Sequence, residues 1–197
     1  MRDDAAHRRQ LLFSIRKSIR YHNARRRFYE RSHNLTAALC VTFGMATTLA
    51  VLFEAGTYWT AGAAAVVTLA AAFDLVVGTT GKVHLHHDLS RRFIGLERLV
   101  IQKVHPNALE LRHWEAERLT IQADEPPVLQ VLDTIVGNEL LQAYGADATQ
   151  LLPVRWYQRW TAHVLDVHTH RLVERRPQDA ETLAAIEPED EEVLVGA

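Results

Sequence analysis

Residues 34–81 read NLTAALCVTFGMATTLAVLFEAGTYWTAGAAAVVTLAAAFDLVVGTTG and contain no Lys or Arg. Two apolar blocks, residues 35–53 and residues 58–80, are joined by the short link 54–57. As helices with a rise of about 1.5 Å per residue, the blocks span roughly 28 Å and roughly 34 Å, against a hydrocarbon core of about 30 Å. The stretch therefore predicts a transmembrane hairpin of two helices, which the mean hydropathy of −0.12 for the whole chain conceals.

The charges that flank residues 34–81 predict how the hairpin is oriented. Residues 1–33 carry ten Lys or Arg against three Asp or Glu, and the link 54–57 carries no positive charge. By the positive-inside rule both termini are expected in the cytoplasm of a multi-pass protein of the cell inner (plasma) membrane. The predicted membrane-interface residues are Arg25, Arg26, Arg27, Arg31, Tyr58, Trp59, Lys82, Arg91 and Arg92.

The sequence on either side of the hairpin is polar and has helical periodicity. Residues 1–33 predict a basic amphipathic cytoplasmic helix, with Leu11, Ile15 and Ile19 on one face. That face suits either the inner leaflet or the surface of a cytoplasmic domain, and the pattern alone leaves both interpretations open.

Residues 82–175 predict a cytoplasmic helical region, and residues 176–197 an acidic flexible tail. The second crossing is expected to run on into a cytoplasmic helix that ends near His105 and Pro106. Further helices are expected from Pro106 to about Gln122, after the break at 124–127, and over about 153–175. No alternating strand pattern of any length is present, so the predicted class is all-α, a membrane hairpin with a cytoplasmic helical bundle. The helical stripe after the second block is Leu85, Leu89, Phe93, Leu96 and Val100.

Asp74 is the one acidic residue within the second apolar block. It lies roughly 10 Å inside the predicted inner boundary, and an acid at this depth should face protein or water. One interpretation is an acidic ring that lines or gates a cation-permeable pore, which one two-helix chain can build only as a homo-oligomer. The other is a packing role, with Asp74 bonded to a cytoplasmic His or Lys or to Thr42, Thr47 or Thr48 of the first block. The candidate pore-lining or gating residues are Asp74, Thr42, Thr47 and Thr48.

Histidines cluster directly after the second block. His84, His86 and His87 are candidates for sensing acidification near the inner boundary, because an unperturbed histidine titrates near pH ~6.5. His84 and His87 share a helical face, but no Cys pair or His-Glu-x-x-His motif accompanies them, and we predict no metal site.

Other chemistries have little support in the sequence. It lacks a glycine-rich phosphate loop and a nucleophile elbow, so we expect no enzyme and no cofactor. The single cysteine, Cys40, excludes a disulfide within this chain. The basic N-terminal residues adjoin a predicted crossing, so lipid rather than nucleic acid is the expected polyanion.

Several short motifs resemble SLATT domains, the two-transmembrane domains associated with nucleotide-signalling and SLOG proteins in bacterial conflict systems. The block YHNARRRFY at 21–29 resembles the start of these domains, and residues 82–99, with HDL at 87–89 and RRF at 91–93, resemble the helix after their second crossing. Asn138 and Glu139, after Pro126 and Pro127, also look similar, and the resemblance covers about residues 10–170. It implies a pore-forming or membrane-disrupting effector of antiphage defence, triggered by a cytoplasmic sensor or nucleotide-signalling partner.

Three hypotheses follow. The first is an oligomeric two-helix membrane effector, an ion channel or pore controlled by its cytoplasmic helices, whose partners are the lipid bilayer and further copies of itself. The second is a non-conducting membrane anchor or scaffold that recruits a soluble partner. The third is a soluble helical protein with residues 34–81 as its buried core.

Overall fold

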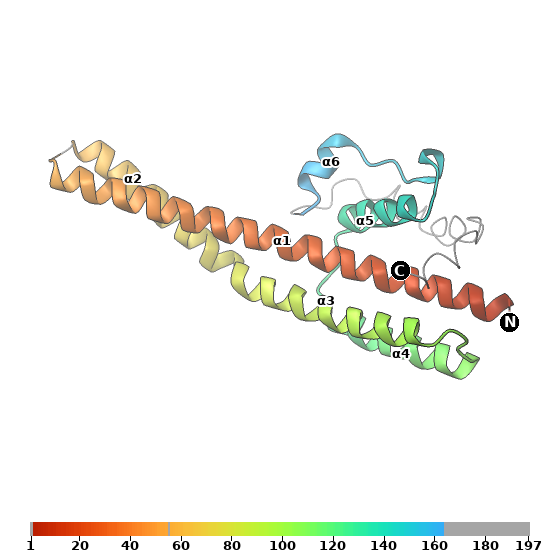
Figure 1. Ribbon diagram of the computed structural model, residues 1–197. Helices are drawn as coiled ribbons and strands as arrows, with labels where there is room; N and C mark the ends of the chain where they lie inside the picture. The colour runs from red at the N-terminus through yellow and green to blue at the C-terminus, as the bar shows by residue number, and fades with distance from the viewer. Residues whose placement is uncertain (1, 55, 164–197) are drawn as a thin grey trace. The chain divides into compact units, whose positions relative to one another are not determined.

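The computed structural model describes residues 2–54 and 56–163, and every regular element within these ranges is a helix (Figure 1). The all-α class is thereby confirmed. The elements are α1 (Arg2–Leu52), α2 (Thr57–Val77), α3 (Thr79–Gln102), α4 (Ala108–Ala123), α5 (Gln130–Ala143), the short 3-10 helix η1 (Ala148–Gln150) and α6 (Trp156–Thr161).

The chain forms two compact units, to which α1 and α3 both contribute. The first, which we call the bundle unit, comprises, among the described residues, 2–21 and 89–163. The second, the paired-helix unit, comprises residues 22–88.

The bundle unit has an apolar core built by α1, α3 and α4. Ile15 of α1, Phe93 of α3 and Leu111 of α4 are each at most 1% exposed and belong to one cluster. The predicted face of the N-terminal helix therefore packs on other helices of this unit, and the inner-leaflet interpretation of that face is wrong. Further core members are Leu11, Leu12, Leu89, Leu96, Val100, Trp114 and Ile121.

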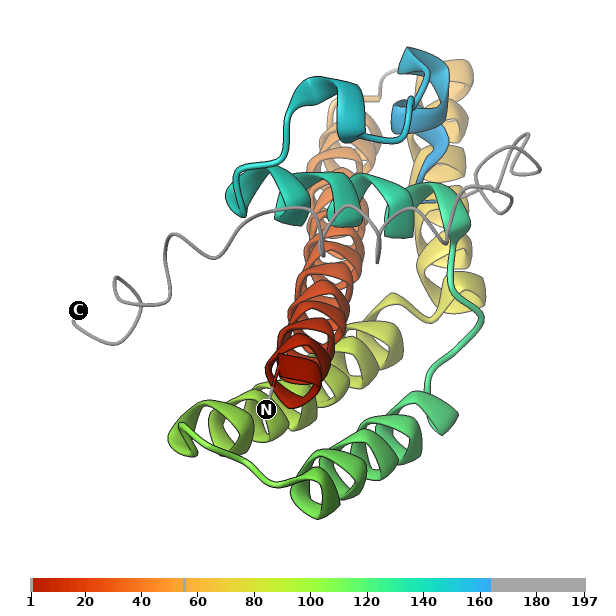
Figure 2. The same cartoon turned by 90° about the vertical axis from the view of Figure 1, so that its right-hand side faces the viewer.

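A second, smaller apolar cluster joins α1 to α5, which lies across it in Figure 2. Phe13 packs against Leu140 and Leu141. Beside this cluster Arg16 donates to Glu97 at 2.6 Å and to the hydroxyl of Tyr144 at 2.5 Å. Polar contacts thus tie α1, α3 and α5 at the edge of the apolar contacts.

The later helices follow the predicted order with shifted ends. Helix α4 begins after Asn107, not at Pro106, because Asn107 and Glu110 form a capping box in which each side chain accepts from the other's backbone N–H. Helix α6 has only six residues. Its Trp156 and Trp160 are 75% and 83% exposed, so neither side chain belongs to the core. The remainder of that predicted helix, residues 164–175, and the predicted acidic tail lie outside the described residues.

In the paired-helix unit the C-terminal half of α1 runs antiparallel to α2, side by side with it (Figure 1). The Cys40 thiol points to the Val67 carbonyl at 3.8 Å. Helix α1 continues unbroken through residue 33, where the sequence suggested a domain boundary, since neither Gly nor Pro occurs in it before Gly44.

The second apolar helix ends earlier than predicted. Gly78 adopts a left-handed conformation (φ 63°) and its N–H donates to the Asp74 carbonyl at 3.0 Å, which ends α2 before α3 begins at Thr79. The expected uninterrupted run from the second crossing into the next helix is therefore wrong. Glycine at this position permits a change of helix direction that other residues resist.

Both long helices carry a segment long and apolar enough to cross a membrane, and only 6% of each of these segments is buried within the structure. Leu75, Val76 and Leu52 are each more than 70% exposed. The hypothesis of a soluble protein with residues 34–81 as its buried core is therefore contradicted, because that core would have to be covered by protein.

Candidate functional site

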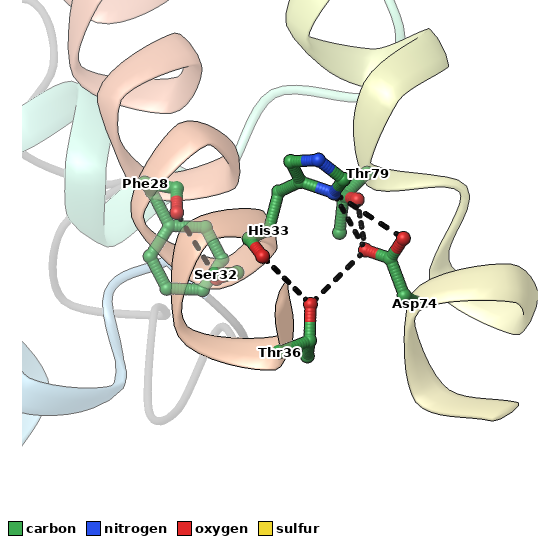
Figure 3. Close-up of polar contacts among 6 residues, drawn as sticks. All are labelled: Phe28, Ser32, His33, Thr36, Asp74 and Thr79. Carbon is green, nitrogen blue, oxygen red and sulfur yellow. Dashed lines mark hydrogen bonds and ion pairs between the residues drawn. The ribbon is translucent and has the colours of Figure 1, made fainter. Parts of the chain in front are cut away.

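Asp74 is the centre of a polar cluster where α1, α2 and α3 meet within the paired-helix unit (Figure 3). The His33 Nδ1 atom lies 3.2 Å and 3.3 Å from the two carboxylate oxygens. The Thr79 hydroxyl donates to Oδ1, and the Thr36 hydroxyl lies 3.5 Å from the same oxygen while donating to the His33 carbonyl at 2.8 Å. Helix α2 therefore supplies the carboxylate, and α1 and α3 supply its partners.

Two local features of the backbone bring these side chains together. The break at Gly78 ends α2 one turn after Asp74, so that the first residue of α3, Thr79, turns its hydroxyl back to the carboxylate. The antiparallel pairing places His33 opposite Asp74 and Cys40 opposite Val67. These two pairs belong to one register, since the midpoint of each pair along the sequence falls between residues 53 and 54. The register is thus set by the short link between the helices.

This register changes the expected depth of Asp74. Counted along its own helix, Asp74 is about 10 Å inside the apolar stretch. Its partner His33, however, directly precedes the apolar stretch of α1. Beside α1, the carboxylate therefore lies at the end of the apolar segment, where a histidine can reach it.

Thr42, Thr47 and Thr48 are not partners of Asp74 among the described residues. Thr47 and Thr48 donate to backbone carbonyls four residues earlier, at 2.8 Å and 3.0 Å. Thr42 lies nine residues beyond His33, about 13 Å farther along α1, too far for a direct bond. The packing alternative therefore named the wrong threonines, since Thr36 of the first block lies near the carboxylate instead. Its other option, a histidine partner, agrees with the contact of His33. Any pore-lining role of these threonines stays a prediction.

A second polar cluster lies at the N-terminal end of the same unit. The Nδ1 atoms of His22 on α1 and His86 on α3 are 3.0 Å apart, and the two side chains are almost fully buried. The Tyr29 ring stacks on His86 at a centroid distance of 5.8 Å. Arg25 and Lys82 lie 4.8 Å and 5.3 Å from the centre of the Tyr29 ring, and Arg25 also donates to the Tyr29 hydroxyl.

The surroundings of His86 make it a poor sensor of mild acid. Burial, followed by the charges of His22, Arg25 and Lys82, lowers the pKa of His86 from 6.5 to about 4. His86 is therefore neutral at physiological pH, and the expected titration near pH 6.5 does not hold for it.

The other two candidate pH sensors lie on the surface. His84 and His87 are exposed, and the His87 Nδ1 atom lies 2.9 Å from an Arg26 nitrogen. Arginine has only donors, so this contact requires an unprotonated acceptor on His87. Sensing by His84 and His87 stays a prediction.

The predicted interface residues fall into two groups. Arg27, Arg31, Arg91, Tyr58 and Trp59 are exposed. The others have partners within the chain: Arg25 and Lys82 at Tyr29, Arg26 with Glu30 at 3.3 Å and with His87, and Arg92 with Asp124 at 2.6 Å.

His33, Thr36, Thr79 and Tyr29 are site residues that the sequence interpretation missed. The available signal was Gly78, since a glycine after an apolar helix is typical of a helix end in the left-handed conformation. A break there would have drawn attention to Thr79 and to the residues opposite it.

No protein-family model matches the chain, and searches of curated proteins and of solved structures returned no match. What the chain does is therefore inferred from its own residues.

Proposed function

We propose that this chain is an integral membrane protein whose apolar helices cross the cell inner membrane as a hairpin, with both termini in the cytoplasm. The observation that carries the proposal is that only 6% of the apolar segments of α1 and α2 is buried within the chain. Their exposed apolar side chains therefore need lipid or other copies of the chain to cover them. The cationic flanks at Arg27, Arg31 and Lys82 support the orientation.

Within that membrane, we propose a homo-oligomeric effector that forms a pore or disrupts the bilayer. Two helices are too few to enclose a water-filled path, so several copies must assemble through their exposed apolar faces. The resemblance to SLATT domains supports a role in antiphage defence, with activation by a cytoplasmic sensor or nucleotide-signalling partner.

The Asp74 cluster is the proposed gate element. In the present arrangement His33, Thr36 and Thr79 lie within hydrogen-bond distance of the carboxylate, whose side chain remains 29% exposed, so a permeating cation would compete with these three partners for it. Opening would require the carboxylate to exchange these donors for water or ions. The cluster links α1, α2 and the start of α3, so a movement of α3 would be transmitted to it directly.

The test is potassium efflux from liposomes that contain the purified full chain. Asp74→Asn retains the size of the side chain and removes its charge, and His33→Ala removes its partner. Both variants are expected to change cation efflux, while Asp88→Asn, an exposed acid on α3, leaves it unchanged. Normal cation efflux in inserted Asp74→Asn protein would contradict the gate, and equal effects of Asp74→Asn and Asp88→Asn would indicate a general charge effect.

A membrane scaffold is the second candidate, and exposed apolar side chains on the bundle unit favour it. Leu109, Leu119 and Trp160 are each more than half exposed and would suit a soluble partner. Protein that is inserted, as shown by its flotation with vesicles, but that releases neither potassium nor dye would support this candidate over the effector.

A further inference from the structure

The short helix α6 of the bundle unit buries its small and polar residues and exposes its tryptophans. Gln158 and the adjoining Ala162, one helical turn apart, are 5% and 1% exposed. Trp156 and Trp160, also one turn apart, are 75% and 83% exposed. A helix on the surface of a protein in water normally has the opposite arrangement, because burying the large indole side chains contributes most to the hydrophobic effect.

Contacts beneath α6 hold it in this orientation. The helix packs on α5, whose Asn138 donates to the Leu152 carbonyl at 2.7 Å and accepts from the Leu152 N–H at 3.0 Å. The buried Gln158 side chain accepts from the N–H of Arg155 at 3.0 Å and so completes the first turn of the helix. A polar residue therefore has a structural reason to take the buried position, and the outward direction of the tryptophans follows from the packing.

Positive charge accompanies the exposed indole rings. Arg155 and Arg159 are exposed and directly precede Trp156 and Trp160 in the sequence. Residues 148–163 contain no Asp or Glu, so this segment has a net positive charge. Indole rings are typical of the membrane–water interface, and a guanidinium group can hold two oxygens of one lipid phosphate. We call the surface formed by these two arginines and two tryptophans the α6 face.

We propose that the α6 face docks onto an anionic lipid surface, with its indole rings among the headgroups and its arginines on lipid phosphates. Helices α1 and α3 run from the paired-helix unit into the bundle unit without a break, so insertion of the apolar helices keeps the α6 face near lipid. This proximity rests on the proposed function, whereas the chemistry of the face does not. A soluble acidic partner would suit the arginines equally, but a bilayer is the partner that the chain itself brings close.

Docking can be measured on the full chain with a fluorophore attached at Thr161→Cys, in a Cys40→Ser background that leaves one labelling site. The vesicles contain phosphatidylcholine, phosphatidylglycerol and a phosphatidylcholine that carries a nitroxide quencher at its headgroup. Docking is expected to quench the label. Arg159→Gln should lower the ratio of docked to free α6 about fivefold, because each basic residue near an anionic surface contributes about that factor. Trp160→Ser should lower it at least as much.

The matched controls are exposed residues on α4 of the same unit. Arg112→Gln and Leu119→Ser remove one exposed charge and one exposed apolar side chain, and each should change the ratio less than twofold. Equal losses in Arg112→Gln and Arg159→Gln would overturn the proposal in favour of diffuse surface charge. Equal quenching in vesicles without phosphatidylglycerol would overturn the anionic requirement.

Insertion is scored separately, by flotation after alkaline extraction. A label that stays unquenched in inserted protein overturns the lipid surface, leaves the proposed function standing and assigns the α6 face to a soluble partner. Quenching without insertion supports the lipid surface and counts against the proposed function alone. A label that stays unquenched without insertion overturns both.

Discussion

The two units of this chain bury opposite kinds of residue. In the bundle unit, Phe93, Leu111 and Ile15 are buried and form the core. In the apolar stretch of the paired-helix unit the buried side chains include Thr36 and Thr79, which are 7% and 1% exposed, while Phe73 and Leu75 are exposed. Water drives the first arrangement through the hydrophobic effect, and the second suits an apolar solvent in which polar groups must find partners within the protein. The comparison is therefore the strongest structural argument that the two units have different solvents.

A matched pair of phenylalanines tests this comparison most strongly. Phe93→Ala in the bundle core should lower the free energy of unfolding by about 3–5 kcal/mol, because it removes contacts and leaves a cavity. Phe73→Ala, at a 52% exposed position on α2, should change it by no more than about 0.5 kcal/mol. Denaturant unfolding of the full chain in detergent, followed by circular dichroism, measures both. A large loss in Phe73→Ala would mean that α2 is covered by protein.

A charge placed on the exposed apolar surface tests the solvent directly. Val41 is 64% exposed on α1, and Val41→Arg should disfavour insertion by about 2.5–3.5 kcal/mol if that surface faces lipid. Leu119→Arg, at a 52% exposed position on α4, should leave insertion unchanged. The inserted fraction is measured by vesicle flotation after alkaline extraction. Insertion of Val41→Arg at the wild-type level would show that this surface does not face the hydrocarbon core.

Replacing one glycine of each unit by alanine tests how the backbone conformation at that position affects stability. Gly78→Ala forces a side chain into the left-handed conformation at the end of α2 and should cost about 1–2 kcal/mol. Gly95→Ala in α3 of the bundle unit meets nothing within 4 Å and should add about 0.5–1 kcal/mol of stability. Thermal unfolding of both variants gives the sign of each effect. Stabilisation by Gly78→Ala would show that α2 and α3 are continuous in solution, as the sequence alone suggested.

The sequence predicted what depends on local pattern and missed what depends on register. The stripe at Leu89, Phe93 and Leu96 identified the buried face of α3, and the absence of Lys and Arg from residues 34–81 identified the two apolar helices. The partners of Asp74 could not be predicted in the same way, because they depend on how a short link aligns two helices of nearly uniform apolar surface. Many registers of such helices look equivalent in the sequence, and a single pair such as His33 and Asp74 distinguishes them only once the structure is known.

The buried histidine pair offers an effect that is absent at neutral pH and develops only in acid. The pKa of His86 is lowered to about 4 by burial and by His22, Arg25 and Lys82, while an unfolded histidine titrates near 6.5. Between these values the unfolded chain binds a proton that the folded chain does not, so this residue lowers stability as the pH falls from 6.5 towards 4 and contributes nothing above that window.

His86→Phe retains a ring beside Tyr29 and removes the titrating group, so its melting temperature should fall less than that of the wild type over the same pH range. Melting in detergent at pH 7.5, 6, 5 and 4 measures the difference between the two proteins, and the carboxylates common to both cancel in it. Because both histidines of the pair belong to the paired-helix unit, parallel curves for the two proteins would mean that His86 is hydrated in solution and that this end of the unit is open to water.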